Sequence, residues 1–472
     1  MTDTLNETRS LPLLWRLALA VLAGLLLTAG YALHPVWWAP WLAPVPFCLA
    51  AATGRGRTWL MGAIAGMVAV TSVLGYYLGQ SGAWAGTLII IVLRVVSWGG
   101  AARFVAWANR RLPVVAAMFA LPLLVAAIET VVIMVSIHGA AGSLAYSQMD
   151  LSGVVQLASL GGVPLIDFTI LLPGSFLGLW LTRPRQPIDL AWAAVVLGGI
   201  ALAAGLYANA RLSAPQAAAR VHATLIATDR FDTIPTDWTK VWSVYAPQVS
   251  ASARAGGIVV LPEKIALLDP APMAVAVRDV SAMAKQTGAT LVVGLETRNG
   301  TTYRNQALIA APDGGIGWYT KQRLVPGFED RDVPGHAPLL VKIAGTPVGL
   351  AICKDMHIPS IGREYAGTAA VMAVPAWDFG QDGWMGARMS LLRGVESGYA
   401  VARSSRDGLV GAYDAQGRIV AEAPSSPGMA VVEADVPAQA RPTVYGRFGN
   451  LFGFASLAAF LVMIGVLSRK RS

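Results

Sequence analysis

Residues 348–359 have the sequence VGLAICKDMHIP, an apolar run that ends on a cysteine and continues into a polar turn. This pattern predicts a buried strand with Cys353 at its carboxyl end. A thiol placed where a strand turns into a loop is well positioned to act on a substrate. A lone cysteine also packs as a small apolar side chain, so Cys353 defines a site only together with other reactive groups.

Two other stretches supply such groups. Residues 257–263 (GIVVLPE) form a second apolar strand pattern that ends on Glu263, and residues 316–326 (IGWYTKQRLVP) place Lys321 just after a hairpin-like run. A carboxylate can accept the proton of a thiol, and a fixed ammonium group stabilises an oxyanion in a dry pocket. In this order Glu263, Lys321 and Cys353 resemble the Glu-Lys-Cys triad of the nitrilase (carbon–nitrogen hydrolase) superfamily. The resemblance implies that Cys353 attacks a carbonyl group, Glu263 accepts its proton and Lys321 holds the oxyanion.

The composition places much of the chain in a lipid bilayer. Of its 472 residues, 55% are hydrophobic and only 13% are charged, far from the average of soluble proteins. Apolar stretches long enough to cross a bilayer predict an integral membrane helical bundle of seven plus one transmembrane helices. The expected spans are residues 13–33, 36–52, 58–78, 84–107, 114–137, 153–181, 189–208 and 448–467. The first span is too long, and is followed too directly by others, to be a cleaved signal peptide.

The basic residues predict how the chain lies across the membrane. The net charge of +9 is spread between the apolar spans and forms no aromatic-interleaved patch, so nucleic acid is excluded as a partner. Lys and Arg favour the cytoplasmic side of short loops. Residues 34–38, 79–83 and 138–149 contain none. The other connections, and the span ends beside them, contain Arg9, Arg16, Arg55, Arg57, Arg103, Arg110, Arg111, Arg183 and Arg185. This alternation predicts that both termini, including Arg469-Lys470-Arg471, are cytoplasmic and that residues 211–445 lie outside.

The pattern changes from Val221 onward to short apolar strands that alternate with amphipathic helical stretches. Examples of the strands are residues 221–227, 290–295 and 369–375. The alternation predicts a layered α/β domain. Periodicity alone does not select one α/β arrangement, but the nitrilase resemblance implies an α-β-β-α sandwich. The expected organisation is a transmembrane bundle (1–210), an inserted nitrilase-like catalytic domain (211–445) and a terminal transmembrane helix with a basic tail (446–472).

The chain as a whole resembles the apolipoprotein N-acyltransferase family. This similarity is carried by Leu261-Pro262-Glu263, residues 321–326 with Glu329, the stretch from Gly386 to Gly408, and Tyr146-Ser147-Gln148. It implies that Cys353 takes an acyl chain from a phospholipid as a thioester and passes it to the α-amine of a lipoprotein's N-terminal cysteine. It also implies a multi-pass protein of the bacterial cytoplasmic (inner) membrane with its catalytic domain on the periplasmic face.

The same resemblance assigns supporting roles to two acidic residues. Glu329 would orient Lys321 and stabilise its charged form, although a solvated loop carboxylate is the alternative. Asp355 retains an acid close behind the nucleophile. We expect no metal and no cofactor, because the histidines are dispersed and the Gly-Gly pairs lack the strand-turn-helix setting of a phosphate loop.

Apolar side chains that follow the strand at 369–375 are candidates for contact with acyl chains. They are Trp377, Phe379, Trp384 and Met385, and ordinary domain core is the alternative for each. Glu129 and Asp167 lie at or near membrane depth, where ionisable groups are costly. The sequence leaves open whether these two acids are functional or interfacial.

Several residues depart from the family pattern. Lys354 and Asp355 follow the nucleophile where the family usually has an aromatic residue and a glutamate, Lys264 directly follows Glu263, and residues 375–378 also differ. These departures keep two alternatives open. One is a membrane-bound amidase or acyltransferase of the same superfamily with a different acceptor. The other is an inactive lipid-binding scaffold.

Overall fold

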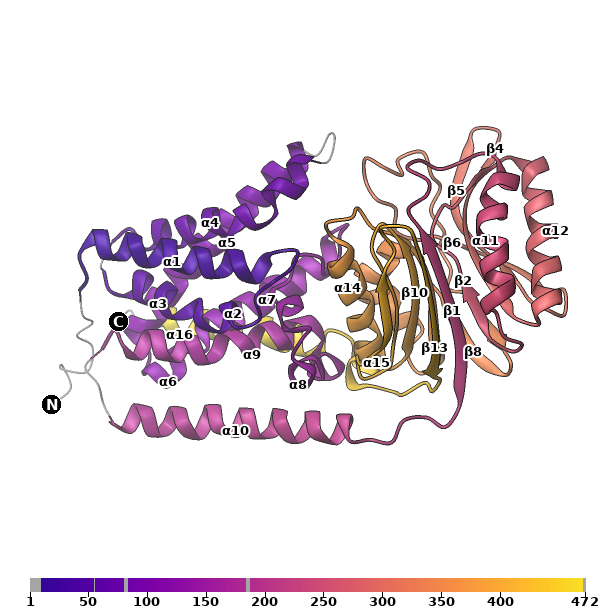
Figure 1. Ribbon diagram of the computed structural model, residues 1–472. Helices are drawn as coiled ribbons and strands as arrows, with labels where there is room; N and C mark the ends of the chain where they lie inside the picture. Colours follow the sequence, from indigo (N-terminus) through magenta and orange to yellow (C-terminus); the bar gives the residue numbers. More distant parts are fainter. Residues whose placement is uncertain (1–9, 55, 80–83, 184–186, 470–472) are drawn as a thin grey trace. The chain divides into compact units, whose positions relative to one another are not determined.

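The computed structural model describes residues 10–54, 56–79, 84–183 and 187–469 (Figure 1). The chain divides into two compact units. The helical unit comprises Met1–Val135, Gly142–Ala210 and Asn450–Ser472, and the sandwich unit comprises Ser136–Ala141 and Arg211–Gly449.

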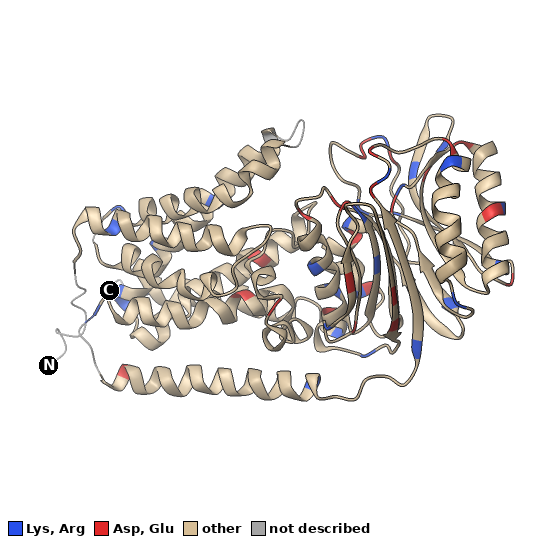
Figure 2. Ribbon diagram, in the orientation of Figure 1, with Lys and Arg blue, Asp and Glu red and all other residues tan. Residues whose placement is uncertain are grey.

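The helical unit consists of apolar helices joined by short connections. In chain order they are α1 (Leu13–Tyr31), α2 (Ala39–Leu42), α3 (Pro44–Ala52), α4 (Thr58–Gly79), α5 (Trp84–Arg111), α6 (Val114–Ala117), α7 (Ala120–Val135), the 3-10 helix η2 (Leu144–Gln148), α8 (Ser152–Val155), α9 (Ala158–Trp180), α10 (Pro187–Leu212) and α16 (Leu451–Arg469). In the described chain, seven helical stretches are long and apolar enough to cross a membrane. Figure 2 shows few charged residues along these helices. The protein is therefore a multi-pass membrane protein.

The expected span at residues 36–52 is shorter than predicted. Helix α2 has 4 residues and α3 has 9, and each begins with a proline in its first turn. Proline is tolerated there but not in a helix interior, so these prolines mark helix starts. With Ala43 between them, the two helices reach only about 21 Å at 1.5 Å per residue. That is less than the hydrocarbon core of about 30 Å, so the full-length spans in the described residues number seven and not eight.

The short segment nevertheless returns the chain to the end of the helical unit where α1 begins. The Leu11 N–H donates to the Thr53 carbonyl at 3.0 Å, and Arg16 Nε donates to the Ala50 carbonyl at 2.9 Å. The residues before α1 and after α3 therefore lie together. The loop alternation behind the predicted orientation does not require this segment to be a full-length helix.

Further arginines gather at this end. Helix α9 packs along α3 in the same direction, so both helices end there. Arg183 lies just after α9 and donates to the Leu112 carbonyl at 2.8 Å. Arg111 lies at the end of α5 and donates to the Leu467 carbonyl at 2.8 Å. One end of the helical unit is thus basic. Arg9, Arg55, Arg185, Lys470 and Arg471 lie outside the described residues.

Two buried polar side chains of the helical unit hold the connections between its helices. Asp167 is buried in α9, and its Oδ2 accepts a hydrogen bond from Ser143 Oγ at 2.9 Å. Gln148, the last residue of η2, donates from Nε2 to the Trp37 carbonyl at 2.8 Å. Glu129 lies half-buried on α7 and also has polar interactions. Asp167 and Gln148 therefore fasten loops to helices.

The sandwich unit contains two mixed sheets. Its strands are β1 (Arg220–Thr228), β2 (Ile258–Val260), β3 (Leu267–Leu268), β4 (Thr290–Asn299), β5 (Thr302–Ala310), β6 (Ile316–Thr320), β7 (Leu340–Ile343), β8 (Thr346–Leu350), β9 (Val371–Trp377), β10 (Ala400–Arg406), β11 (Leu409–Tyr413), β12 (Ile419–Pro424) and β13 (Met429–Pro437). One sheet has the order β13-β1-β2-β4-β5-β6, with β3 paired to β4, and the other has the order β12-β11-β10-β9-β8-β7.

Helices cover the outer face of each sheet. They are α11 (Trp238–Ser252), α12 (Pro270–Thr287), the 3-10 helix η3 (Cys353–His357), α13 (Pro359–Glu364), α14 (Gly383–Ser397) and α15 (Val444–Phe448). Along β1, Val221 and Leu225 point into the core between the sheets, whereas Ile226 packs under α11 and α12, because successive strand side chains alternate. Helix α14 packs on β10 and β11 of the other sheet (Figure 1). The predicted α-β-β-α sandwich is confirmed.

The sandwich unit also includes six residues from the first half of the chain. Residues 136–141 follow α7, and the Ala140 N–H donates to the His357 carbonyl at 3.1 Å. This short loop therefore packs on η3, the helix that begins with Cys353.

Candidate active site

The three residues of the predicted triad lie at the carboxyl ends of strands from both sheets. Glu263 follows β2, Lys321 follows β6 in the same sheet, and Cys353 follows β8 in the other sheet. All three side chains are buried, with Lys321 only 1% exposed and Cys353 9% exposed. The sandwich brings together residues that are up to 90 positions apart in the chain, because carboxyl ends of strands in the two sheets meet at one edge.

Lys321 lies between two carboxylates. Its Nζ is 2.7 Å from Glu263 Oε1 and 2.8 Å from Glu329 Oε2. Burial alone lowers the pKa of this ammonium group, but Glu263 and then Glu329 outweigh burial and raise the pKa well above its usual value. Lys321 is therefore a fixed cation at neutral pH. Glu329, predicted to orient it, contacts it directly.

Asn305 is a member of the cluster that the sequence analysis missed. Asn305 lies on β5, and its side-chain Nδ2 donates to Glu263 Oε1 at 2.5 Å and to Glu329 Oε1 at 2.6 Å. Its main-chain carbonyl accepts a hydrogen bond from the main-chain N–H of Lys321 at 2.9 Å. One amide thus holds both carboxylates on either side of the lysine. Asparagine is depleted from strands, so an asparagine inside a strand pattern was the signal that could have identified it.

Cys353 adopts a backbone conformation that is rare for a residue with a side chain. Its φ is +44°, in the left-handed region, at the first position of η3. Its Sγ lies 3.5 Å from the Trp377 carbonyl oxygen. Burial, and then the Glu263 carboxylate, raise the pKa of the thiol well above its usual range, against a lowering influence of Lys321. The resting sulfur is therefore a thiol, and a base must take its proton when it reacts.

Asp355 joins the turn that carries Cys353 to the segment that follows Lys321. Its Oδ1 accepts from the backbone N–H groups of Gln322 and Arg323, at 3.1 and 2.8 Å. Its Oδ2 accepts from the Ile352 N–H at 3.0 Å and from Tyr319 OH at 2.8 Å. This fully buried carboxyl has a pKa raised to about 6, because burial outweighs its hydrogen bonds. Asp355 thus contacts both the turn that carries the nucleophile and the segment after Lys321.

Lys354, which follows the nucleophile and departs from the family pattern, contacts the protein backbone through its side chain. Its Nζ donates to the Leu324 carbonyl at 2.7 Å, and the residue is 3% exposed. Burial, and then the Lys321 cation, lower its pKa to about 8. Lys354 thus helps to hold residues 321–325 against η3, as Asp355 does.

The candidates for acyl-chain contact have different environments. Trp377 ends β9, and its Nε1 donates to Asp407 Oδ2 at 2.8 Å. Phe379 is 38% exposed, and its ring centroid lies 4.9 Å from that of Phe328, which is 48% exposed. Trp384 is half-buried on α14, and Met385 is buried there. Phe379 and Phe328 form an exposed aromatic pair on two loops that flank the triad.

Asp378, in the stretch that departs from the family pattern, forms a buried ion pair. Its Oδ1 lies 2.5 Å from Arg403 Nη2, and its Oδ2 accepts from Ser405 Oγ at 2.9 Å. Burial outweighs this pairing and raises the pKa of the Asp378 carboxyl to about 6. The pair fixes the end of β9 to β10, behind the carbonyl that contacts Cys353.

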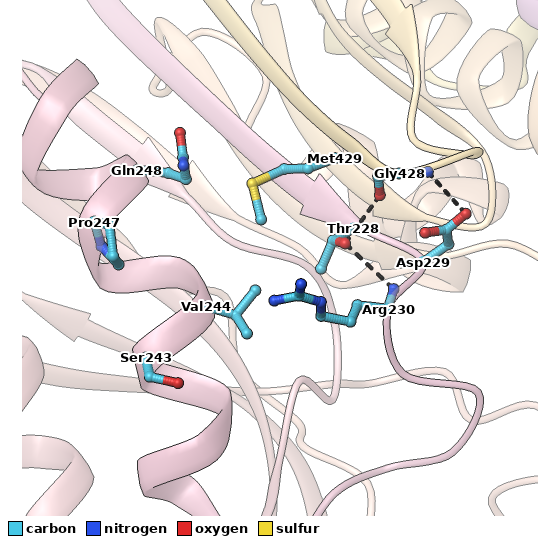
Figure 3. Close-up of a pocket in the computed structure, with 9 residues that line it drawn as sticks. All are labelled: Thr228, Asp229, Arg230, Ser243, Val244, Pro247, Gln248, Gly428 and Met429. Atoms are coloured by element: carbon cyan, nitrogen blue, oxygen red, sulfur yellow. Dashed lines mark hydrogen bonds between the residues drawn. The ribbon is translucent and has the colours of Figure 1, made fainter.

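A separate pocket lies in the same unit (Figure 3). Its volume is about 490 Å³, and it is lined by Thr228, Asp229, Arg230, Ser243, Val244, Pro247, Gln248, Gly428 and Met429. Thr228 Oγ1 donates to the Gly428 carbonyl at 2.9 Å and accepts from the Arg230 N–H at 3.2 Å. None of the triad residues lines this pocket. Among the described residues, no group of three or more His, Cys, Asp or Glu side chains is arranged to hold a metal ion.

The fold and the match of the carbon-nitrogen hydrolase family model to residues 219–443 define the sandwich unit as a member of the nitrilase superfamily. A second family model, for the apolipoprotein N-acyltransferase N-terminal domain, matches residues 23–176. The chain belongs to the apolipoprotein N-acyltransferase family.

Curated relatives bear the same name. The apolipoprotein N-acyltransferase of Geobacter metallireducens is 24% identical over 370 residues, 70% of this chain and 70% of the relative. That of Chlamydia caviae is 27% identical over 174 residues, 33% of this chain and 31% of the relative. The chain therefore matches about a third of the length of the Chlamydia protein. A protein named as a hydrolase in Mycobacterium tuberculosis is 32% identical over 111 residues, 21% of this chain and 40% of the relative.

Two of the solved structures that match cover about half of this chain. A carbon–nitrogen hydrolase superfamily protein from Xanthomonas campestris is 16% identical and covers 52% of this chain and 97% of its own, with a TM-score of 0.40. An amidase from Nesterenkonia is 21% identical and covers 46% of this chain and 90% of its own, with a TM-score of 0.39.

Proposed function

We propose that this protein transfers a fatty acyl chain from a phospholipid, through a thioester on Cys353, to the α-amine of a lipoprotein's N-terminal cysteine. The observation that carries the proposal is the buried contact of Lys321 with Glu263 and Glu329, beside a strained thiol, in a chain with seven apolar spans. Family membership supports the lipid donor and the lipoprotein acceptor. A bilayer-anchored enzyme can meet both substrates, because their acyl chains lie in the membrane.

The first half-reaction forms the thioester. Glu263 accepts the thiol proton as Cys353 Sγ attacks the ester carbonyl, and Lys321 stabilises the resulting oxyanion. The bonds that Glu263 receives from Lys321 and Asn305 both fall on Oε1, so we assign Oε2 to the thiol proton. The C–O bond then breaks, Glu263 returns the proton to the leaving alkoxide, and lysophospholipid departs.

The second half-reaction forms the amide. The amine of the acceptor attacks the thioester, Lys321 stabilises the second oxyanion, and Glu263 takes a proton from the nitrogen and returns it to sulfur as the C–S bond breaks. The first N–H groups of a helix have no partner within that helix, so the Lys354 N–H, in the first turn of η3, is a second candidate donor to both oxyanions. Two covalent steps on one cysteine predict ping-pong kinetics.

The orientation is part of this proposal. Because Lys and Arg favour the cytoplasmic side, we assign the basic end of the helical unit to the cytoplasm. Both termini then lie inside, and residues 211–445 lie on the periplasmic face of the inner membrane. The exposed Phe328–Phe379 pair is the apolar surface that we assign to contact with acyl chains.

A product assay tests the proposed reaction against its alternatives. Purified protein is mixed with phospholipid and a synthetic diacylated lipopeptide, and the products are identified by mass spectrometry, with Cys353→Ala as the control. We expect equal amounts of N-acyl lipopeptide and lysophospholipid, and neither product with C353A. Release of ammonia or acid from amide compounds, without lipopeptide acylation, would instead identify the amidase alternative. Absence of any Cys353-dependent product would leave only the lipid-binding scaffold.

A further inference from the structure

Lys264, directly after Glu263, is a buried cation in a strained backbone position. The residue is 5% exposed, and its φ is +49°, in the left-handed region that side chains rarely adopt. Such strain persists only where the surrounding structure enforces it. The turn directs Glu263 and Lys264 to separate sets of partners.

The Lys264 ammonium group lies among three acidic side chains. Its Nζ is 2.8 Å from Asp332 Oδ2, 3.1 Å from Glu329 Oε1 and 3.5 Å from Glu296 Oε1. All three carboxyl groups belong to residues that are at most 6% exposed. Burying a lysine here is favourable only because these acids compensate its lost hydration.

Glu329 links this second lysine to the triad. Its Oε2 contacts Lys321 Nζ at 2.8 Å and accepts from the Val325 N–H at 2.7 Å, while its Oε1 contacts Lys264 and Asn305. Lys264, Glu329, Lys321 and Glu263 therefore form a continuous chain of alternating charge. Lys264 stabilises the Glu329 carboxylate, and Lys321 stabilises both Glu329 and Glu263.

We infer that Lys264 is a positioning residue, which holds Glu329 ionised and in place so that Lys321 stays protonated and directed at the oxyanion. This role deepens the proposed function and rests on it. The charged groups that surround Glu329 are Lys264, Lys321, Lys354, Glu263, Glu296 and Asp332. Lys264 offsets Asp332 and, together with Arg331, Glu296, and both acids would otherwise compete with Glu329 for positive charge.

The role predicts a specific change in the pH dependence of catalysis. Burial raises the pKa of Glu329, but Lys321 and then Lys264 outweigh it and lower the pKa to about 2. Replacing Lys264 by methionine removes one of these cations, so Glu329 should gain a proton at a higher pH. The acid limb of the pH profile is the range in which the acylation rate falls as the pH decreases. In K264M this limb should move to higher pH by about one unit or more.

The test measures single-turnover acylation of Cys353 by a water-soluble p-nitrophenyl ester, between pH 2 and 8, from the p-nitrophenol released in quenched samples. Variants are Lys264→Met, Lys264→Arg and Arg331→Met. Arg331 contacts Glu296 at 3.0 Å from a half-exposed position and is the matched control. We expect K264M to shift the acid limb, K264R to restore it, and R331M to leave it unchanged. A K264M protein with the wild-type limb, whatever its rate, overturns the inference.

A double-mutant cycle separates this role from simple neutralisation of Asp332. If Lys264 acts through Glu329, K264M should produce no further shift in an E329Q protein, because the carboxylate it acts on is gone. If it only neutralises Asp332, K264M should shift the limb in the E329Q protein as much as in wild type, and that result contradicts the inference. Because the ester is not a lipid, acylation by the ester but not by phospholipid would reject the proposed donor and leave the role of Lys264 intact.

Discussion

At the scale of single residues, the site depends on how buried charges are paired. Lys321 and Glu329 are nearly excluded from solvent, and each stabilises the charged form of the other. Breaking such a pair by removing one partner leaves an uncompensated charge, which costs more than the pair itself contributes. Substitutions that keep the shape but remove the charge are therefore the informative ones.

Asn305 should be nearly as sensitive to substitution as the charged residues. Asn305→Ala removes two hydrogen bonds to carboxylates, and one such bond to a charged group contributes about 1.5–3 kcal/mol. We expect acylation of Cys353 to slow by about 10- to 100-fold. Asn305→Asp, which places a third carboxylate between Glu263 and Glu329, should be slower still. An N305A protein with the wild-type single-turnover rate would show that the amide does not position the two acids.

The stability of the sandwich unit should depend on Glu329 in acid. The folded-state pKa of this carboxyl is about 2, against an ordinary value of 4.5. The group therefore contributes stability that is fully present above pH 4.5 and is lost as the pH falls through 2. Denaturant unfolding of wild type and Glu329→Gln in detergent, at pH 6 and at pH 3, measures this contribution. The advantage of wild type should shrink at pH 3, and an advantage that grows there would contradict the assigned pairing.

At the scale of elements, the reactive turn is held by contacts between the two sheets. Three of the four hydrogen bonds that Asp355 accepts connect η3 to β6 and to the backbone after Lys321. These bonds determine where the nucleophile lies relative to the cation. A change in this carboxylate should therefore act on geometry as well as on stability.

Asp355→Ala should destabilise the protein and nearly abolish acylation. The variant leaves three backbone N–H groups and one hydroxyl without their acceptor, and each unsatisfied buried donor costs about 1–3 kcal/mol. Asp355→Asn keeps one acceptor oxygen and should retain more stability and more activity. Unfolding midpoints and single-turnover rates of both variants measure the effect. Equal stability of D355A and wild type would show that the turn is held by other contacts.

The exposed aromatic pair should matter for lipid donors only. Phe379→Ala removes a half-exposed ring that contacts Phe328, and loss of apolar burial of this size costs about 1.5–3 kcal/mol. We expect the KM for phospholipid to rise about 10-fold or more, while the rate with a water-soluble ester is unchanged. The matched control is Trp318→Ala, which alters a half-buried ring packed among the core residues under α11 and α12. An equal loss of activity with phospholipid and with the water-soluble ester would show that Phe379 supports the structure of its loop and does not contact the acyl chain.

Sequence patterns identified most of these elements but not all of their contacts. Glu263, Lys321 and Cys353 each end an apolar run, and ends of strands are recognisable in a single sequence. Asn305 could not be found in that way, because its partners lie on two other elements. The short α2–α3 segment has the apolar composition of a span, and only its prolines indicate that the helix is interrupted. Residues 136–141 have no pattern of their own, so their packing on η3 appears only in the fold.

At the scale of the whole molecule, the question is which side of the membrane holds the sandwich unit. A cysteine introduced at the exposed position Lys285 on α12, in a Cys48→Ala background, can be labelled with a membrane-impermeant maleimide. We expect labelling in intact spheroplasts, because the basic end of the helical unit is assigned to the cytoplasm. The parent C48A protein, in which Cys353 is buried, is the control. Labelling only after the membrane is permeabilised would reverse the orientation.

The most direct measurement of the proposed chemistry is the intact mass of the purified protein after incubation with phospholipid. Wild type and Cys48→Ala should both gain the mass of one fatty acyl group, and hydroxylamine should remove it, because a thioester is labile to that nucleophile. Cys353→Ala should gain nothing. An acyl group that persists in C353A, or a wild-type protein that stays unmodified with every phospholipid, would contradict acyl transfer through Cys353.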